Sequence, residues 1–426
     1  MNFSISPALN LRGCISVPGD KSISHRALML GALAEGKTVI RGLAPGEDVR
    51  STKHCLQQLG VSIQEKSGKI HVTGGLGLQK SETILDAGNS GTTMRLLAGI
   101  LAGQPFSTTI TGDASLRRRP MRRIIEPLAQ MGATIKSSEN GGAPLEIHGG
   151  KLNGIRYQMP IASAQLKSGV LFAGWGAEGE TVIEEKIPTR DHSERLLRKM
   201  GARLSVVNHQ STVISVRAGK LYGGEIEVPG DFSSAAFFIA AAVLLNGSEL
   251  MIKNVGVNST RTAFLDGVRQ MGAEIEIVNV RHESYEPIAD LIVRSHPLFA
   301  APMSGAQIPL LIDEIPILAV MATQAEGETH IRDARELRVK ESDRIAALVH
   351  NLRAMGAVVE ELPDGLVITG PTKLRGAEID SFGDHRMAMA FAIAGLLADA
   401  PTVIHHAECV DISFPEFFEI LKNVVR

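Results

Sequence analysis

The chain has 426 residues, of which 44% are hydrophobic and 21% are charged, and its net charge at neutral pH is −2. This length predicts two or three domains with large cores, and the near-neutral charge gives no field that would attract nucleic acid or an anionic membrane. The three cysteines are widely spaced without a Cys-x-x-Cys pair, which argues against a disulfide framework and a cysteine-ligated zinc site. The first residues show no secretory signal, and the longest apolar runs, 235–245 and 387–398, are too short to cross a bilayer, so we expect a cytoplasmic protein.

The first motif in the chain, residues 18–26, reads Pro-Gly-Asp-Lys-Ser-Ile-Ser-His-Arg and runs into an apolar, helix-like segment. Pro-Gly breaks the chain, and Asp20 or Ser22 can cap the helix that follows. Lys21, Ser22 and Arg26 then lie around backbone N–H groups that have no partner within the helix, and such a helix end binds phosphate or carboxylate. A capped helix with solvated charges is the alternative.

The second motif, residues 88–95, reads Gly-Asn-Ser-Gly-Thr-Thr-Met-Arg. Its glycines let the backbone approach a ligand, and Thr92 or Thr93 can cap the helix that follows. The spacing is not that of a P-loop. Taken alone, the motif is a weak signal, and it favours an ordinary turn between a strand and a helix over a binding site.

Five arginines occupy residues 117–123. No aromatic residues lie among them and the chain is slightly acidic, so the pattern does not favour nucleic-acid binding. Pro120 is expected to start a helix, which would leave Arg119 beside the helix N-terminus, where it could bind an anion. The other arginines are expected to be solvated.

Two further motifs place polar groups where helices are expected to begin. Residues 163–168, Ser-Ala-Gln-Leu-Lys-Ser, precede an apolar segment, and residues 189–194, Thr-Arg-Asp-His-Ser-Glu, have the pattern of a cap followed by a helix. A zinc site is not indicated, because His192 has no second histidine at a useful spacing. Helix capping alone would explain most of both motifs.

Two carboxylates interrupt the apolar run 308–319. Asp313 can be an N-cap with Glu314 in the first turn and Pro316 close behind it. A carboxylate among apolar residues also has a raised pKa, which suits a general acid or base. The two interpretations are compatible, and both stay open.

The last two motifs lie at 337–344 and 382–388. In the first, Lys340 and Arg344 would share one face if the stretch is helical, with Glu341 adjacent; an ion-paired surface helix is the alternative. The second, Phe-Gly-Asp-His-Arg-Met-Ala, brings three polar residues to the start of another apolar helix.

An internal repeat organises the chain. The phrase Leu-x-x-Leu/Met-Gly, with valine in place of the first leucine in one copy, occurs five times, and the glycines of successive copies are 69 to 84 residues apart. Each copy is typical of a helix end closed by a left-handed glycine and followed by a strand. The spacing predicts six units, and the strand missing from the sixth is expected from residues 3–5 at the N-terminus. The repeated glycines are Gly60, Gly132, Gly201, Gly272 and Gly356.

The phrase Val-Pro-Gly-Asp-x-Ser at residues 17–22 recurs 211 residues later. Two halves of three units each explain this, so we expect an α/β (α+β) fold with two lobes. Lobe one would be 20–229, and lobe two would combine 1–19 with 230–426, with hinges near 18–20 and 229–231. A small-molecule site in the cleft between the lobes, with closure over it, is the default expectation.

Together these motifs resemble the 3-phosphoshikimate 1-carboxyvinyltransferase (5-enolpyruvylshikimate-3-phosphate synthase) family of enolpyruvyl transferases, over essentially the whole chain. The resemblance implies six βαβαββ units, three per lobe, and transfer of enolpyruvyl from phosphoenolpyruvate to the 5-hydroxyl of shikimate 3-phosphate, with no cofactor or metal. This reaction of the shikimate pathway, which leads to chorismate and aromatic amino acids, is the target of glyphosate. We expect these two small molecules as partners, neither nucleic acid nor membrane, and a monomer.

The resemblance also assigns residues. To shikimate 3-phosphate it assigns Lys21, Ser22, Arg26, Ser163, Gln165, Arg190, Asp313 and Lys340. To phosphoenolpyruvate it assigns Lys21, Asn89, Gly91, Arg119, Gln165, Arg344 and Arg386. Glu341 is the candidate for proton exchange at C3 of phosphoenolpyruvate and Asp313 for the base on the 5-hydroxyl, with Lys21 and His385 in support; which carboxylate performs which step stays open.

One position departs from the family pattern. Before Ser413-Phe414-Pro415, where many members carry lysine, this chain has Ile412. The substitution removes one cation from the phosphoenolpyruvate side. Gly91 is present, so an alanine that would block glyphosate is absent at that position.

The sequence argues against three other functions. The related UDP-N-acetylglucosamine enolpyruvyl transferases use a loop cysteine as acid, and residues 112–121 contain none. An RNA-binding protein would use the arginines at 117–123, but the net charge argues against it. A non-catalytic anion-binding module would have no need of Asp313 and Glu341 among the cations.

Overall fold

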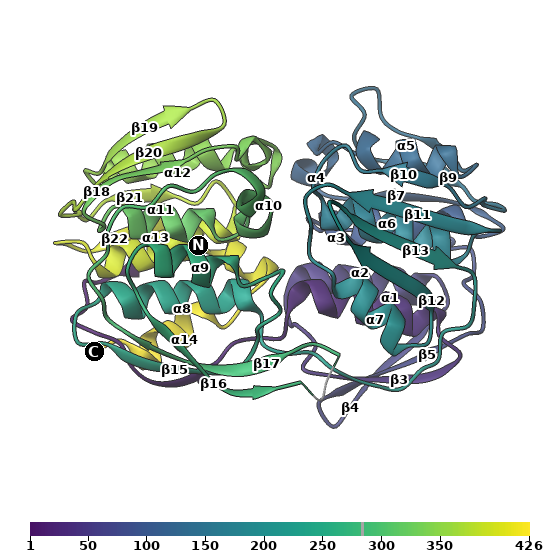
Figure 1. Ribbon diagram of the computed structural model, residues 1–426, viewed down its shortest axis with the longest axis horizontal. Helices are drawn as coiled ribbons and strands as arrows, with labels where there is room; N and C mark the ends of the chain where they lie inside the picture. Colours follow the sequence, from purple (N-terminus) through teal and green to yellow (C-terminus); the bar gives the residue numbers. More distant parts are fainter. Residues whose placement is uncertain (283–284) are drawn as a thin grey trace. The chain divides into compact units, whose positions relative to one another are not determined.

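The computed structural model describes residues 1–282 and 285–426. Contacts divide the chain into two compact units, one formed by residues 19–228 and the other by residues 1–18 together with 229–426 (Figure 1). The changes of unit fall between Pro18 and Gly19, inside the first Pro-Gly-Asp phrase, and between Val228 and Pro229, directly before the second. That these crossings act as hinges stays a prediction.

Three four-stranded sheets form the unit 19–228, in the orders β14-β3-β5-β4, β6-β7-β9-β8 and β10-β11-β13-β12. In each, a parallel pair is followed by two antiparallel pairings. The strands are β3 Gly36–Arg41, β4 Ser62–Lys66, β5 Lys69–Gly74, β6 Leu85–Asp86, β7 Ser107–Thr111, β8 Thr134–Lys136, β9 Leu145–His148, β10 Arg156–Gln158, β11 Glu180–Glu185, β12 Arg203–Asn208, β13 Thr212–Arg217 and β14 Glu225–Glu227. The helices are α1 Lys21–Leu33, α2 Glu47–Gln58, α3 Gly91–Ala102, α4 Ala114–Arg118, α5 Arg122–Gln130, α6 Ala164–Trp175 and α7 His192–Lys199.

The second unit has sheets in the orders β16-β17-β15-β2, β18-β20-β19 and β1-β22-β21. Its strands are β1 Phe3–Ile5, β2 Arg12–Ser16, β15 Glu249–Gly256, β16 Ile275–Arg281, β17 Ile288–Arg294, β18 Gly327–Ile331, β19 Val358–Leu362, β20 Gly365–Gly370, β21 Glu378–Asp380 and β22 Thr402–His405. Its α-helices are α8 Phe232–Leu244, α9 Ala263–Gln270, α10 Ile308–Leu311, α11 Ile315–Ala322, α12 Arg344–Ala354, α13 His385–Leu396 and α14 Phe417–Val424. Its 3-10 helices are η1 Gly305–Gln307, η2 Arg335–Val339 and η3 Ala407–Ile412.

Strands from distant parts of the sequence complete the repeats. Strand β1 pairs antiparallel with β22, with Phe3 opposite Ile404, which confirms that the N-terminus supplies the strand missing from the last repeat. Strand β2 pairs in parallel with β15, and β14 pairs in parallel with β3. Strand β2 therefore lies just before the first change of unit and β14 just before the second, and each completes the first sheet of the unit to which it belongs.

The repeated helix ends have the predicted geometry. Helices α2, α5, α7, α9 and α12 are each followed within two residues by a glycine with positive φ, between 84° and 103°. A strand begins two to three residues after each of these glycines. Glycine is favoured there because a left-handed residue ends the helix without a Cβ clash.

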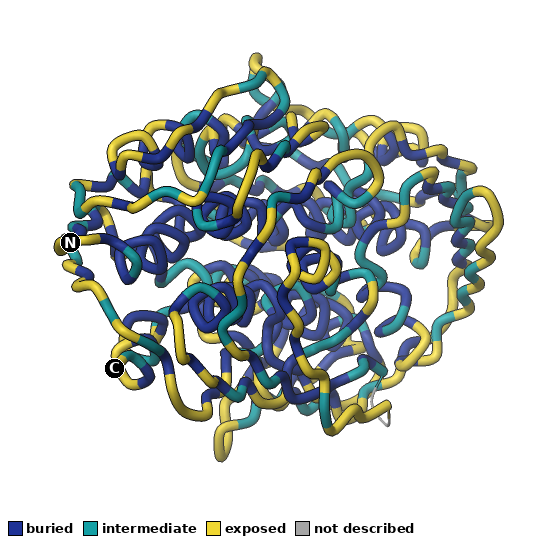
Figure 2. The backbone as a smooth tube through the Cα atoms, turned by 60° about the vertical axis from the view of Figure 1, so that its left-hand side comes forward, coloured by how far each residue is buried: buried dark blue, intermediate teal, exposed yellow. Residues whose placement is uncertain are grey.

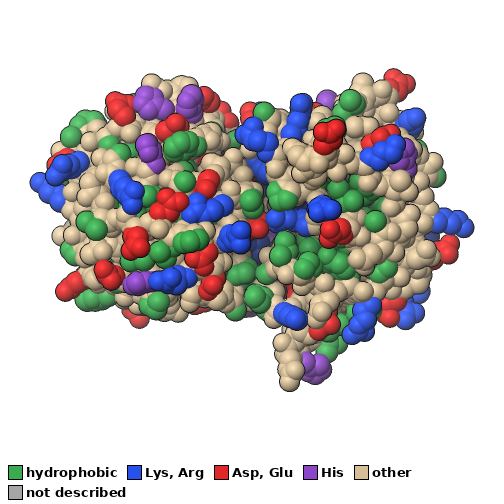
Figure 3. All heavy atoms as spheres, turned by 90° about the horizontal axis from the view of Figure 1, so that it is seen from above, with side chains coloured by type: hydrophobic (Ala, Val, Ile, Leu, Met, Phe, Trp, Pro, Cys, Tyr) green, Lys and Arg blue, Asp and Glu red, His purple; other side chains and the backbone are tan. Residues whose placement is uncertain are grey.

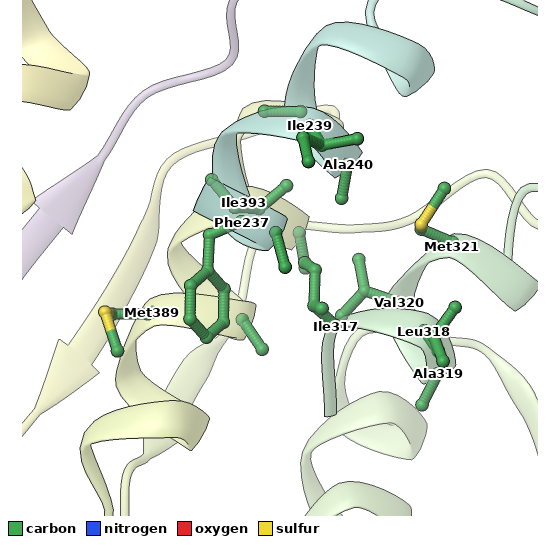
Figure 4. Packing of buried hydrophobic residues seen from close by; sticks show 14 of the residues in the cluster. Phe237, Ile239, Ala240, Ile317, Leu318, Ala319, Val320, Met321, Met389 and Ile393 are labelled. Carbon is green, nitrogen blue, oxygen red and sulfur yellow. The ribbon is translucent and has the colours of Figure 1, made fainter. Parts of the chain in front are cut away.

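Apolar helices form the interior of each unit. In α3, α11 and α13 every residue is buried, and α8 is buried from Phe232 to Val243, so these helices expose no face to solvent (Figure 2). Side chains of α8, α11 and α13 pack against one another, including Phe237, Ile317 and Met389 (Figure 4). Ile412 packs against the same core, as expected for an apolar residue at that position.

In the other unit, α3 and α6 are in contact at a pair of glycines. A Cβ on Gly99 would lie 2.1 Å from the carbonyl oxygen of Gly169. The two backbones approach so closely that the interface leaves no room for a side chain, which fixes the relative position of the two helix N-termini.

Lysine and arginine side chains and aspartate and glutamate side chains are scattered among uncharged groups over the face shown in Figure 3. Across residues 1–282 and 285–426, no single helix has the length and apolar composition to cross a membrane. One pair, Gly305–Leu311 with Ile315–Ala322, meets that criterion only when joined, and the two segments are bent by 110°.

Candidate active site

The N-termini of the inner helices meet within each unit. In the unit 19–228, Gln165 of α6 donates a 3.0 Å hydrogen bond to Thr92 of α3, and Arg26 of α1 donates a 2.6 Å bond to Ser168 of α6. Three motifs that are far apart in the sequence are therefore neighbours at one end of this unit. Unpaired helix N–H groups and a positive helix end favour anions there.

The α1 motif is fixed by its cap and by one ion pair. Asp20 is the N-cap and accepts a hydrogen bond from the N–H of Ile23 at 2.8 Å, in agreement with the sequence prediction. Lys21 lies 3.0 Å from Asp48, and both side chains are mostly buried. Behind them, burial holds the pKa of His25 well below its ordinary value, assisted by the charges of Lys21 and Arg26.

Arg26 is almost fully buried, and its guanidinium donates to Ser193 at 2.7 Å, to Ser168 at 2.6 Å and to the carbonyl of Ser22 at 2.8 Å. The two serines continue the network, because Ser193 donates to Ser168 and Ser168 donates to the carbonyl of Ala164. These three acceptors hold the guanidinium in one orientation.

The glycine motif brings two arginines and an amide together. Arg119 donates a 2.6 Å hydrogen bond to Asn89, whose amide donates to Asp113 at 2.7 Å. A Cβ on Gly91 would lie 2.7 Å from Nη1 of Arg95 and 3.5 Å from Nη1 of Arg119. Glycine therefore lets the backbone lie against both guanidinium groups, and a side chain here would displace the end of Arg95.

Arg95 has a role that the sequence motif did not single out. Its guanidinium donates to Oε1 of Gln165 and, at 3.3 Å, to the carbonyl of Pro120. Arg95 therefore links α3, α6 and the turn before α5. The signal in the sequence was its position in the first turn of an apolar helix, where an arginine is buried at a cost unless it is bound.

Lys167 is a second residue that the sequence did not single out. Its ammonium lies 2.7 Å from Glu194 and 3.0 Å from Glu185, and it donates to the carbonyl of Thr189 at 3.2 Å. All three ionic side chains are at most 4% exposed. The cluster joins α6 and β11 to the turn that carries Arg190, which precedes Asp191, the N-cap of α7.

Ser163 is the N-cap of α6, as predicted, and accepts from the N–H of Leu166 at 3.4 Å. Two other capping predictions in this unit were wrong. Ser90 rather than Thr92 or Thr93 caps α3, because the helix begins at Gly91. Pro120 does not start a helix: α4 ends before Arg119, and α5 begins at Arg122 with Met121 as its N-cap.

In the second unit, Asp313 lies between two arginines. Its carboxylate is 3.6 Å from Nη1 of Arg344 and 3.7 Å from Nε of Arg386, and its carbonyl accepts from Nη1 of Arg386 at 3.0 Å. Asp313 is partly exposed, and it is not the N-cap of α11: Glu314 holds that position, and its side chain is turned into the interior.

Glu341 accepts a 2.7 Å hydrogen bond from Arg344. The stretch containing Lys340 and Glu341 is not helical, because Lys340 has extended backbone and α12 begins only at Arg344, with Asp343 as its cap. Lys340 and Arg344 therefore do not share a helical face, in contrast to that interpretation of the spacing. Burial lowers the pKa of Lys340, although the carboxylate of Asp313 opposes the shift.

Asp384 is the N-cap of α13 and accepts from the N–H of Arg386 at 2.9 Å and from Nε of Arg344 at 2.7 Å. Burial alone would lower the pKa of Arg344, but the carboxylates of Asp384 and Glu341 raise it overall. His385 begins α13 and is 1% exposed. The sequence placed Asp384 in the polar motif at this helix start without giving it a role; the structure shows that it binds Arg344 and caps the helix that carries Arg386.

Among the residues that the structure describes, no group of three or more histidine, cysteine, aspartate or glutamate side chains is arranged to hold a metal ion. The three thiols, Cys14, Cys55 and Cys409, are free.

The architecture matches solved enolpyruvyl transferases. A structure of EPSP synthase from Acinetobacter baumannii aligns with a TM-score of 0.87 and 45% identity, covering 100% of this chain and 98% of that one. The enolpyruvyl transferase NikO from Streptomyces tendae aligns with a TM-score of 0.81 at 16% identity, covering 99% of this chain and 96% of that one. The second match shows a shared fold. The chain therefore has the enolpyruvyl transferase fold.

The sequence comparisons give the family. The family model for EPSP synthase (3-phosphoshikimate 1-carboxyvinyltransferase) matches residues 5–421. The 3-phosphoshikimate 1-carboxyvinyltransferase of Synechocystis sp. is 55% identical over 98% of this chain and 94% of its own, and that of Desulforudis audaxviator is 52% identical over 100% of this chain and 99% of its own. The chain belongs to the EPSP synthase family. Its activity is that of a 3-phosphoshikimate 1-carboxyvinyltransferase in the shikimate pathway.

Proposed function

We propose that the chain binds phosphoenolpyruvate and shikimate 3-phosphate through the residues assigned above and joins them through a tetrahedral intermediate. The observation that supports this most is the pair of arginines around Asp313. Nη1 of Arg344 makes no hydrogen bond within the described residues, although it lies 3.6 Å from Asp313, so one donor of a fixed guanidinium remains for a substrate carboxylate. Arg386 would supply a second guanidinium group for the same carboxylate.

For shikimate 3-phosphate, the proposed ligands in the unit 19–228 are those at the starts of α1, α6 and α7. Arg26 is buried and held in one orientation by Ser193 and Ser168, and a fixed guanidinium suits the binding of a dianionic phosphate. The full proposed set is Lys21, Ser22, Arg26, Ser163, Gln165 and Arg190 in that unit and Asp313 and Lys340 in the other.

For phosphoenolpyruvate, the proposed ligands in the unit 19–228 lie around the glycine motif. Arg119 and the backbone at Gly91 would bind the phosphate, which leaves as inorganic phosphate at the end of the reaction. The full proposed set is Lys21, Asn89, Gly91, Arg119 and Gln165 in that unit and Arg344 and Arg386 in the other.

The chemistry requires two proton movements at C3 of phosphoenolpyruvate. In the proposed mechanism, Asp313 removes the proton of the 5-hydroxyl as its oxygen attacks C2, while C3 is protonated; loss of a C3 proton then expels phosphate. Glu341 is the proposed group for exchange at C3, and its 2.7 Å hydrogen bond from Arg344 fixes its orientation. Lys21 and His385 would support the charge and proton movements.

The test is phosphate release from phosphoenolpyruvate by the purified protein, with and without shikimate 3-phosphate. Wild type is compared with Glu341→Ala and with Glu328→Ala, an exposed carboxylate on β18 of the same unit as a matched control. We expect release that requires shikimate 3-phosphate, persists in the control and falls at least about 100-fold in Glu341→Ala. Release only with UDP-N-acetylglucosamine would assign the chain to the sister reaction, and release independent of any acceptor would contradict the mechanism.

A further inference from the structure

The two copies of the Pro-Gly-Asp phrase have the same local structure but different surroundings. Asp20 caps α1 and Asp231 caps α8, each accepting a hydrogen bond from the N–H three residues later. The serine two residues after each cap is Ser22 in the first copy and Ser233 in the second. Each copy therefore presents a helix N-terminus with a hydroxyl at the same position.

At the N-terminus of α8, the carboxylate of Glu314 occupies the kind of site that is proposed to bind a substrate anion at the N-terminus of α1. Ser233 donates a hydrogen bond to Glu314, and Arg261 donates to Ser233 at 2.9 Å and to Asp231 at 3.3 Å. Glu314 is 1% exposed and Arg261 is 3% exposed. A buried carboxylate is thus bound by a hydroxyl at a positive helix end, with a guanidinium on the same hydroxyl.

The contacts of Glu314 bear on the position of Asp313, the residue before it in the sequence. Its carbonyl accepts from the N–H of Leu318 at 3.0 Å, so Glu314 begins α11 while its side chain is bound at the start of α8. On the other side, the carbonyl of Asp313 accepts from Arg386 at the start of α13. The peptide groups on both sides of Glu314, the first of which carries the carbonyl of Asp313, are therefore held by Arg386 and by the first turn of α11.

We propose that Glu314 is a positioning residue, which fixes the carboxylate of Asp313 for its role in the reaction through the contact with Ser233. Stability alone does not account for a carboxylate at this site, because replacing a buried ion with an apolar side chain of similar volume often leaves the folded protein equally stable or makes it more stable. The inference rests on the proposed role of Asp313 as the base on the 5-hydroxyl.

The variant Glu314→Gln keeps the volume and removes the charge that Ser233 and the helix end bind. We expect kcat to fall about 10- to 100-fold, since a displacement of a reacting group by about 1 Å can cost about 100-fold. The KM for phosphoenolpyruvate should change less than about 3-fold. Asp290→Asn is the matched control, because this buried carboxylate of the same unit accepts from Asn254 and Asn279, outside the proposed site, and should keep wild-type kcat.

A double-mutant cycle separates positioning from a general structural loss. In an Asp313→Asn background, Glu314→Gln should lower kcat less than about 2-fold, because the group it positions is already gone. An equal loss in both backgrounds, or no loss in the wild-type background, would overturn the inference.

A second variant covers the case in which Glu314→Gln fails to fold. Ser233→Ala removes the hydroxyl and leaves the carboxylate, and it should lower kcat about 3- to 10-fold at unchanged KM for phosphoenolpyruvate; unchanged kcat would overturn the inference. A wild type without acceptor-dependent phosphate release would overturn the proposed function and this inference with it. An active wild type insensitive to both variants overturns the inference alone.

Discussion

Replacing Lys167 with methionine removes the one cation that the structure places between two buried carboxylates. Methionine keeps much of the apolar stem, so the change is mainly electrostatic. Glu185 and Glu194 would then face each other without compensation, and both are at most 4% exposed. Breaking a buried ion pair by removing one partner typically costs about 3 to 5 kcal/mol. For a domain of this size the unfolding midpoint would fall by about 2 to 4 °C per kcal/mol, or about 6 to 20 °C in all.

The pH dependence gives the more specific test. Burial raises the pKa of Glu185, and the charge of Lys167 opposes that shift. Without the lysine, the pKa of Glu185 in the folded protein should rise further above its value in the unfolded chain. A carboxyl whose pKa is higher in the folded protein takes up protons on folding. It therefore does not destabilise the folded state below the pKa of the unfolded chain, and its destabilising effect develops as the pH rises through the pKa of the folded protein. The loss of stability in Lys167→Met should therefore be larger at pH 8 than at pH 5.

The assay is denaturant unfolding of the full chain at pH 5 and pH 8, followed by far-ultraviolet circular dichroism. Lys151→Met is the matched control: this lysine of the same unit is 91% exposed and pairs with an exposed glutamate, so its loss should cost less than about 0.5 kcal/mol. A free energy of unfolding for Lys167→Met within about 1 kcal/mol of wild type at pH 8, or the same loss of stability at both pH values, would contradict the electrostatic role of Lys167.

Two further predictions concern single sites. Gly91→Ala should raise the KM for phosphoenolpyruvate about 10-fold or more with little change in the unfolding midpoint, because the new Cβ would lie 2.7 Å from a flexible arginine end. Steady-state kinetics measures the KM, and an unchanged KM would show that the backbone at Gly91 is not part of the site. With a disulfide reagent at pH 8, the exposed Cys14 should react first, whereas Cys55 and Cys409 should react only on unfolding, because burial raises the pKa of each to about 12; rapid reaction of all three thiols in the native protein would contradict that burial.

Much of the architecture could be predicted because the repeat leaves a regular signature. The glycine after each outer helix needs a left-handed conformation, and the inner helices are mainly apolar, so both are visible as residue types. The completion of the last sheet by residues 3–5 also followed, because the repeat count left one strand missing.

The errors arose where several adjacent residues could perform the same task. Ser90, Thr92 and Thr93 can all cap a helix, and only the observed start at Gly91 decides among them. The interchange of Asp313 and Glu314 has the same origin, since either carboxylate can precede α11. Lys167 was not singled out because its two partners lie 18 and more residues away, on β11 and α7, and nothing in the local pattern indicates that they meet.

The exchange of strands around the two crossings has a consequence for the order in which the protein folds during synthesis. The unit 19–228 holds its whole sheet set, including β14, in one continuous stretch, so it can be completed before the ribosome has made any partner for residues 1–18. Those first residues must wait, since β2 pairs with β15 and β1 pairs with β22, near the other end of the chain. Residues 1–18 are thus made before the unit 19–228 but find their place after it, and the last sheet of the second unit cannot close until β22 has been made.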